Sequence, residues 1–146
     1  MLSHLNISFL QTYPCHNKTM SDFTFLGSSS LLMTTGHSND HKNVVLWDTL
    51  MPAKKCMVSS FACHENGASS IIYAPLNQIL ITGGKKGEVY IFDMRQRIQR
   101  DRFQAHLGAV KCIALDPGED FFATGSSDGD IKVYLGRIFI FFTGSK

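Results

Sequence analysis

The sequence of 146 residues is poor in charge and has no long hydrophobic run. Charged residues make up 18% of the chain, and the formal net charge is only +2. So small a charge gives no bulk electrostatic reason to expect a nucleic acid or an acidic membrane as a partner. The apolar stretch at residues 138–142 is far shorter than the about 20 residues of a membrane-spanning helix. We therefore expect no nucleic-acid partner and no membrane span, and peripheral association with a membrane remains an open alternative.

Cysteine is also scarce, with four in the chain: Cys15, Cys56, Cys63 and Cys112. They have no paired spacing and no accompanying second cluster of cysteine or histidine, so the sequence indicates no zinc site. The first residues lack a basic region and a small-residue cleavage site, which makes them a poor secretory signal. We therefore expect a cytoplasmic protein with free thiols, no metal and no cofactor.

Three segments of the chain are similar to one another. They read "LLMTTGHSNDHKNVVLWD", "ILITGGKKGEVYIFD" and "FFATGSSDGDIKVYL". Each has an apolar strand, a Thr-Gly pair, a polar turn and a second apolar strand that ends in an aromatic residue. This order is typical of a β-hairpin, and it occurs three times.

A histidine precedes each hairpin at a nearly constant distance. The histidines lie 20, 19 and 19 residues before the glycine of the hairpin; the pairs are His16 with Gly36, His64 with Gly83, and His106 with Gly125. Further strand candidates lie between histidine and hairpin ("DFTFL", "SSIIYA", "VKCIAL") and before the second and third histidines ("MVSSFA", "RDRFQA"). Four short strands in a unit of about 40 to 45 residues indicate a propeller blade.

These units resemble WD repeats. The dipeptide that ends such a repeat is present as Trp47-Asp48, relaxed to Phe92-Asp93 and altered to Tyr134-Leu135. The resemblance implies an all-β fold, a β-propeller fragment of about three four-stranded antiparallel blades. The expected division is an outer strand of a preceding blade or a linker at 1–15, three repeats at 16–134 (about 16–61, 62–104 and 105–134), and an apolar tail foreign to the family at 135–146.

WD repeats contain a hydrogen-bonded network of a histidine, a serine or threonine, an aspartate and the tryptophan. The resemblance places this structural network in the three units at the following residues: His16, Thr35 and Trp47; His64, Thr82 and Phe92; His106, Thr124, Asp128 and Tyr134. In the first unit Asp40 or Asn39 is expected to serve as the acceptor. In the second unit Lys86 stands where the aspartate belongs, which predicts a broken network.

The pairs Cys15-His16 and Cys63-His64 invite a catalytic interpretation, that of a thiol hydrolase. Neighbours on an extended chain point in opposite directions, however, so each cysteine is badly placed to be activated by its own histidine. Recurrence at one repeat position explains the histidines without chemistry. We therefore predict no catalytic residues, and no metal binding by His37 and His41.

Basic residues cluster around the second hairpin and its exit. They form a possible interaction patch for an anionic lipid or an acidic partner: Lys85, Lys86, Arg95, Arg97, Arg100 and Arg102. The alternative is a solvated connection whose charges protect a sheet edge.

Whole phrases of the sequence narrow the resemblance further. "NVVLWDTL", "YAPLNQILITGGKKGEVYIFDMRQR" and "QAHLGAVKCIALDP" look like the carboxy-terminal WD region of the DmX-like, or rabconnectin-type, proteins. That resemblance implies a non-enzymatic scaffold that regulates V-ATPase assembly and the acidification of vesicles and endomembranes. It also implies V-ATPase peripheral subunits and their assembly factors as partners, and a cytoplasmic location peripheral to vesicles.

Three blades are fewer than the 4 to 8 with which propellers close. We therefore expect that the remaining blades, or a second copy of the chain, are needed to close a ring. A stand-alone WD-repeat adaptor with unrelated protein partners is the alternative interpretation. The tail at 135–146 is not expected to be a functional motif, although residues 137–142 could improvise a fourth strand.

Overall fold

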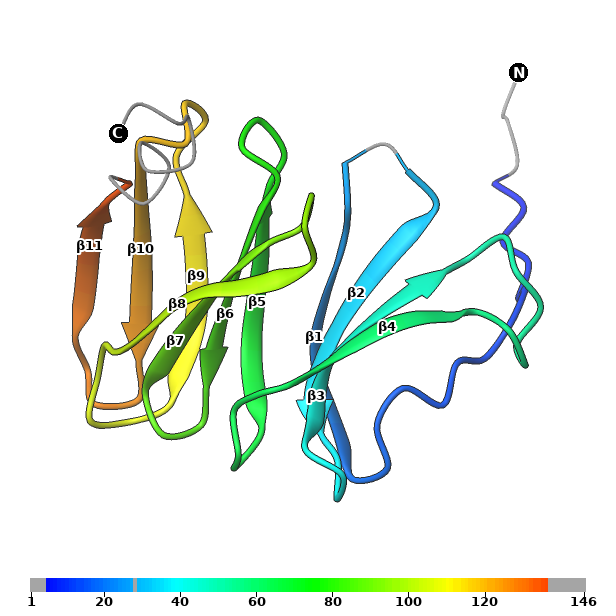
Figure 1. Ribbon diagram of the computed structural model, residues 1–146, viewed down its shortest axis with the longest axis horizontal. Coiled ribbons are helices and arrows are strands. Elements are labelled where there is room, and N and C mark those ends of the chain that lie inside the picture. The colour runs from blue at the N-terminus through cyan, green and yellow to red at the C-terminus, as the bar shows by residue number, and fades with distance from the viewer. Residues whose placement is uncertain (1–4, 28, 137–146) are drawn as a thin grey trace.

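The structure, a computed structural model, describes residues 5–27 and 29–136, and all regular elements in these ranges are β-strands. The strands form three antiparallel sheets that lie side by side (Figure 1). Sheet 1 has the order β1 (Thr19–Phe25), β2 (Leu31–His37), β3 (Lys42–Asp48) and β4 (Met57–Ala62). Sheet 2 has the order β5 (Ala68–Ala74), β6 (Ile79–Gly84), β7 (Glu88–Asp93) and β8 (Ile98–Gln104). Sheet 3 contains β9 (Val110–Leu115), β10 (Phe121–Ser126) and β11 (Ile131–Leu135).

The predicted all-β architecture of antiparallel blades is confirmed, with one difference in strand number. Sheets 1 and 2 have four strands each, whereas sheet 3 has three within the described residues. Residues 137–142, for which a fourth strand was considered, lie outside the described part of the chain. The inner strands β1, β5 and β9 are neighbours from sheet to sheet, and β4 and β8 form the outer edges of their sheets (Figure 1).

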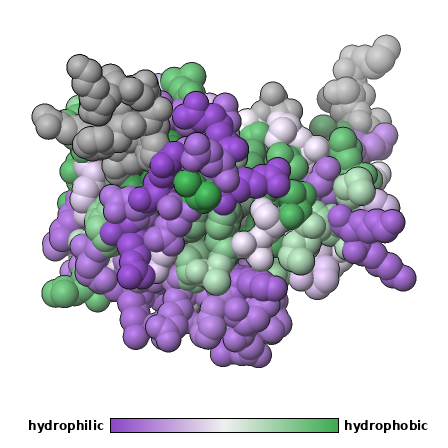
Figure 2. Space-filling view, viewed as in Figure 1, coloured by the Kyte–Doolittle hydropathy of each residue, from purple (hydrophilic) through white to green (hydrophobic). Residues whose placement is uncertain are grey.

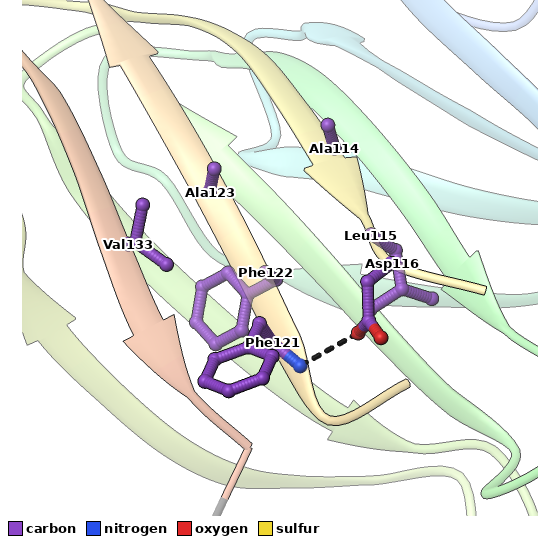
Figure 3. Close-up of a pocket in the computed structure, with 7 residues that line it drawn as sticks. All are labelled: Ala114, Leu115, Asp116, Phe121, Phe122, Ala123 and Val133. Carbon is purple, nitrogen blue, oxygen red and sulfur yellow. Dashed lines mark hydrogen bonds between the residues drawn. The ribbon is translucent and has the colours of Figure 1, made fainter. Parts of the chain in front are cut away.

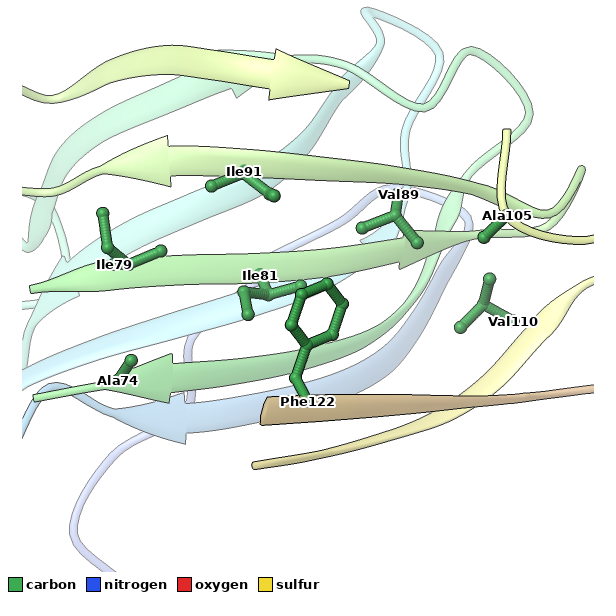
Figure 4. Close-up of a cluster of buried hydrophobic side chains, with 8 residues drawn as sticks. All are labelled: Ala74, Ile79, Ile81, Val89, Ile91, Ala105, Val110 and Phe122. Carbon is green, nitrogen blue, oxygen red and sulfur yellow. The ribbon is translucent and has the colours of Figure 1, made fainter. Parts of the chain in front are cut away.

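Sheet 2 is buried on both faces because it lies between the other two sheets. Leu80 and Phe92 point toward sheet 1, whereas Ile81 and Ile91 point toward sheet 3. Figure 4 shows the second of these cores, with the ring of Phe122 from β10 pointing toward Ile81. Burial on both faces explains why "VYIF" is a continuous apolar run rather than an alternating one.

The turn between β6 and β7 holds the chain that leads into sheet 3. Gly87 has a positive φ of 84°, a conformation that favours glycine. Its carbonyl oxygen accepts hydrogen bonds from the backbone N–H groups of Ala105 (2.9 Å) and His106 (3.0 Å). A Cβ at Gly87 would collide with the backbone oxygen of His106, so only glycine allows this approach.

Residues 5–15 contain no strand, so the outer strand considered for residues 1–15 is absent from their described part. The end of the segment instead packs against sheet 1 through Tyr13 and Cys15. Tyr13 packs on Trp47 with the ring centroids 6.0 Å apart, and its hydroxyl donates to the carbonyl oxygen of Thr49 at 3.3 Å.

Candidate functional site

The three repeated histidines each contact a threonine hydroxyl of the second strand in their sheet. His16 Nε2 lies 3.1 Å from Thr34 Oγ1, His64 Nε2 lies 2.7 Å from Thr82 Oγ1, and His106 Nε2 lies 2.8 Å from Thr124 Oγ1. All three threonines are buried. A buried hydroxyl or imidazole without a partner costs about 1–3 kcal/mol, so each pair satisfies two groups that would otherwise destabilise the sheet.

The expectation that Thr35 belongs to the first network is wrong, and Thr34 takes that place. The register between the first two strands of each sheet contains one irregularity, which lies between Met20 and Asp22 in sheet 1 and between Ala68 and Ser70 in sheet 2. When sheets 1 and 2 are aligned at these bulges, Thr34 of sheet 1 corresponds to Thr82 of sheet 2. Thr35 points to the opposite face, where its hydroxyl donates to the carbonyl oxygen of Asp22 at 3.2 Å.

The assignment of Thr34 also explains the uneven spacing of 20, 19 and 19 residues. Gly36 pairs with Met20 just as Gly84 pairs with Ala68, so the first Thr-Gly pair is displaced by one residue from the others. Measured to the threonine that the histidine contacts, the spacing is 18 residues in every unit.

The corrected network predicts a difference between two neighbouring threonines. The Thr34 hydroxyl accepts the indole N–H of Trp47 at 2.9 Å and also contacts His16, so Thr34→Val leaves buried polar groups unpaired. We expect Thr34→Val to lower the free energy of unfolding by about 2 kcal/mol, because unpaired buried groups cost about 1–3 kcal/mol. Thr35→Val, the isosteric control on the other face, is expected to cost about 1 kcal/mol or less. Urea denaturation followed by tryptophan fluorescence measures both, and a larger cost at Thr35 would contradict the assignment.

The second network contains a carboxylate, contrary to the prediction from Lys86, but Phe92 adds no hydrogen-bond donor to it. Glu88 supplies the carboxylate, with its Oε1 2.8 Å from Nδ1 of His64, while Lys86 contributes only its backbone N–H, which donates to Glu88 Oε2 at 3.1 Å. Glu88 lies two residues further along, at the start of β7, and its carboxylate and the His64 ring both lie beside Gly84. Burial alone would raise the pKa of Glu88, but the hydrogen bond with His64 and those with the backbone outweigh it and lower the pKa.

The lowered pKa of Glu88 makes stability depend on pH in a definite direction. A carboxyl whose pKa is lower in the folded state stabilises the fold fully above its unfolded pKa of about 4.3, and this stabilisation is lost as pH falls through the folded value. We expect Glu88→Gln to be less stable than the parent protein at pH 7. The difference in the free energy of unfolding should shrink as the pH is lowered from about 6 to about 3. Denaturant titrations across this range measure the difference, and a constant value would contradict the role of the charge.

The third network keeps its predicted members. His106 Nδ1 lies 3.3 Å from Asp128 Oδ2, within ion-pair range but without the alignment of a hydrogen bond. A hydrogen bond from the backbone of Asp130 and the field of His106 lower the pKa of Asp128. Burial raises the pKa of Tyr134, and the nearby Thr124 side chain opposes this shift. Tyr134 occupies the position in β11 that Trp47 has in β3.

The acceptor expected in the first network is neither Asn39 nor Asp40. The Nδ1 atom of His16 lies 3.3 Å from Ser38 Oγ, and Asp40 instead lies 3.9 Å from Lys42. The first hairpin is three residues longer than the second, counted between the paired residues Thr34 and Val45 and the equivalent pair Thr82 and Tyr90, so these two side chains are carried away from the histidine. Burial lowers the pKa of His16.

An aromatic residue three positions before each histidine completes the repeated cluster, and the sequence analysis did not identify it. The ring pairs are Tyr13 with Trp47 (6.0 Å), Phe61 with Phe92 (4.5 Å) and Phe103 with Tyr134 (5.1 Å). The constant spacing to histidine was the available signal. Phe92 has no donor for Thr82, and it contributes by packing against Phe61 from the neighbouring sheet.

The Cys63-His64 pair lacks the chemistry of a thiol nucleophile and its base. Burial raises the pKa of the Cys63 thiol to about 12, so the thiol stays protonated at neutral pH. Both ring nitrogens of His64 already contact Glu88 and Thr82. Among residues 5–27 and 29–136, no group of three His, Cys, Asp or Glu side chains is placed to hold a metal ion. The same described part of the chain has no helix that could cross a membrane.

The predicted basic patch divides into two groups at opposite ends of β7. Lys85 and Lys86 lie in the turn before β7, whereas Arg95 and Arg97 lie in the turn after it. Hydrophilic side chains dominate the lower rim in Figure 2, where the turns of the hairpins lie.

The remaining two arginines lie on the outer strand β8, and each has a polar partner. Arg100 Nη2 lies 3.3 Å from Asp93 Oδ2, and Arg102 Nη1 lies 3.4 Å from the Tyr90 hydroxyl. Arg100 therefore stands near the Arg95 end of β7, and Arg102 near the Lys86 end.

Comparison with known proteins agrees with this geometry. The profile of the WD domain, G-beta repeat, matches residues 55–93 and 97–134. The chain belongs to the WD-repeat family. It is 51% identical over 123 residues to DmX-like protein 1 of Homo sapiens and 52% identical over 122 residues to that of Mus musculus. Each alignment covers 84% of this chain but only 4% of the relative, so the chain spans a small fraction of these proteins.

Solved structures share the architecture without close sequence similarity. The crystal structure of the computationally designed Ika4 protein superposes with a TM-score of 0.67 at 15% identity, covering 84% of this chain and 69% of that one. This similarity shows the fold alone. Each family match begins with the outer strand of one sheet (β4 or β8) and continues through three strands of the next, so the sequence repeat is offset from the sheet.

Proposed function

We propose that this chain is a non-enzymatic protein-interaction scaffold that acts in the assembly of the V-ATPase, and thereby in the acidification of vesicles and endomembranes. The observation that carries the proposal is the 51–52% identity to DmX-like protein 1 over 84% of this chain. By comparison, the chain is 27% identical over 134 residues to the HIR1 protein of Yarrowia lipolytica. The much higher identity to DmX-like protein 1 supports a partner surface that this chain shares with that protein. The proposed location is cytoplasmic, peripheral to vesicles.

The rim that carries the β6–β7 turn is the best candidate for partner binding. Lys85 is brought close to His37 of sheet 1: a Cβ placed on Gly67 would lie 3.1 Å from His37 Cβ and 3.3 Å from Lys85 Cδ. Desolvation, followed by the positive charges of Lys18 and Lys85, lowers the pKa of His37. Basic side chains from two sheets therefore gather at this rim, which suits an acidic segment of a partner protein.

Two charge-reversal variants test the proposal. Tagged chain expressed in cells is expected to co-purify with V-ATPase peripheral subunits. Lys85→Glu/Lys86→Glu should reduce this recovery at least about tenfold, since charge complementarity guides such contacts. Arg95→Glu/Arg97→Glu is the matched control, because it makes the same change of charge at the opposite end of β7, and it should retain recovery. A folded parent chain that recovers no V-ATPase subunit would refute the proposal.

A further inference from the structure

The outer face of sheet 3 exposes apolar side chains at positions that are buried in the other sheets. Ile131 and Val133 on β11 are 76% and 66% exposed. Val133 and Phe121 of β10 line an open apolar surface on this face (Figure 3). Val133 pairs with the residue that precedes the network threonine in the second strand of its sheet. Leu46 in sheet 1 and Ile91 in sheet 2 pair with the equivalent residues, so the three positions correspond.

The equivalent positions in sheets 1 and 2 show what packs against this face of a sheet. Leu46 and Ile91 are 0–1% exposed because each packs against the next sheet along the chain. The outer face of sheet 3 thus has the side chains of a sheet-to-sheet interface whose second sheet is not among the described residues.

The opposite end of the molecule exposes the complementary half of the same interface. Phe23 and Phe25 on β1 are 56% and 53% exposed. The equivalent of Phe23 is Ile71 in sheet 2 and Ile113 in sheet 3, since each pairs with the network threonine, and both pack against the preceding sheet. The two ends of the chain therefore present the two faces that meet twice inside it.

The outer edge of sheet 3 also lacks the strand that completes sheets 1 and 2, within the described residues. In sheets 1 and 2 the outer strand is the segment just before the next histidine, β4 before His64 and β8 before His106. The corresponding segment before His16 forms no strand, although Tyr13 occupies the place of Phe61 and Phe103 against the aromatic residue of the third strand. Within the described residues, β11 in turn has a neighbour on one side only. A strand donor and a strand acceptor are therefore both present, at opposite ends.

We propose that two copies of the chain associate head to tail. The Phe23 face of sheet 1 in one copy covers the Val133 face of sheet 3 in the other, and residues 9–14 of the first pair with β11 of the second. Because each copy carries both halves, two equivalent contacts form and six sheets close into a ring, within the 4 to 8 blades that propellers use.

Two charged variants and their mixture test the arrangement. The purified full-length chain is expected to sediment at twice its mass of 16.3 kDa. Phe23→Asp and Val133→Asp are each expected to weaken the dimer at least about 100-fold, because either places a carboxylate in both contacts. Leu107→Asp is the control: it makes a similar apolar-to-acidic change at a fully exposed loop residue, and it should remain dimeric. Circular dichroism checks that each variant is folded.

Mixing the variants separates head-to-tail pairing from the alternatives. One contact in the mixed pair joins two unaltered faces, so an equimolar mixture should form a dimer that neither variant forms alone. A contact between two sheet 3 faces would instead leave Phe23→Asp dimeric and give no recovery on mixing. A monomeric parent chain would overturn the proposal, as would the absence of recovery.

Cys112 provides an independent readout. It pairs with Gly125 at the position that Asp22 has in sheet 1, where the carboxylate reaches across to the backbone N–H of Ile71 in the next sheet at 3.1 Å. Cys112 is exposed in the single chain. We expect iodoacetamide to label it at least about tenfold more slowly in the parent protein than in Val133→Asp. Equal rates would contradict coverage of this face.

Discussion

Replacing Phe92 with alanine should lower the free energy of unfolding by about 3–5 kcal/mol, the range for a fully buried phenylalanine. Phe92 is buried and lies between two sheets, with its ring centroid 4.5 Å from that of Phe61 in β4 and 6.2 Å from that of Tyr90. Truncation removes the contacts that hold sheet 1 to sheet 2 and leaves a cavity. Urea denaturation, monitored by circular dichroism, measures the effect.

The control at this position is Phe92→Leu. It keeps most of the apolar volume and should cost less than about 1.5 kcal/mol. If alanine and leucine proved equally costly, the ring itself rather than filled volume would be the source of stability. A cost below about 1 kcal/mol for alanine would show that the two sheets do not pack through Phe92.

The second large effect is expected for His64→Ala, at about 3 kcal/mol, since it unpairs a buried hydroxyl and removes packing. The imidazole is buried, contacts Thr82 and Glu88 through its two nitrogens, and lies 4.4 Å from the Tyr90 ring between centroids. His37→Ala is the control, because it removes a histidine at the rim without opening the buried network. Its cost should stay within about 0.5 kcal/mol.

A double-mutant cycle distinguishes a network from independent contacts. Thr82→Val alone should cost about 1–2 kcal/mol, because it leaves the imidazole without one partner. Combined with His64→Ala it should add clearly less than its own cost, since residues in one hydrogen-bond network are not additive. Strict additivity, measured by denaturant titration of all four proteins, would mean that the histidine and threonine act separately.

The repeated pattern in the sequence was sufficient to predict the fold, because the same strand and turn residues occur in three units. Three hairpins with turn residues at equivalent places predicted antiparallel blades, and β4, β5, β8 and β9 lie where short strands were expected. The aromatic positions were also predicted correctly, since Trp47 and Tyr134 occupy equivalent positions in β3 and β11.

The site was harder to predict because a strand changes face at every residue. The first unit has two successive threonines before its glycine, so alignment on the Thr-Gly pair selected Thr35, whose side chain lies on the opposite face from that of Thr34. Lys86 suggested a missing carboxylate because equivalence was judged by distance along the turn. Glu88 reaches His64 across the hairpin instead, a contact set by register rather than by spacing.

The offset between sequence repeat and sheet also has a consequence for the order of events during synthesis. The third strand of sheet 1 ends at Asp48, but its outer strand β4 ends only at Ala62. At translation rates of about 5–20 residues per second, sheet 1 waits about 1–3 s with the edge of β3 unpaired before its last strand emerges. Sheets 1 and 2 are thus each completed by the first strand of the family repeat that follows. During synthesis the edge of β3, and later that of β7, therefore stays open until that strand emerges.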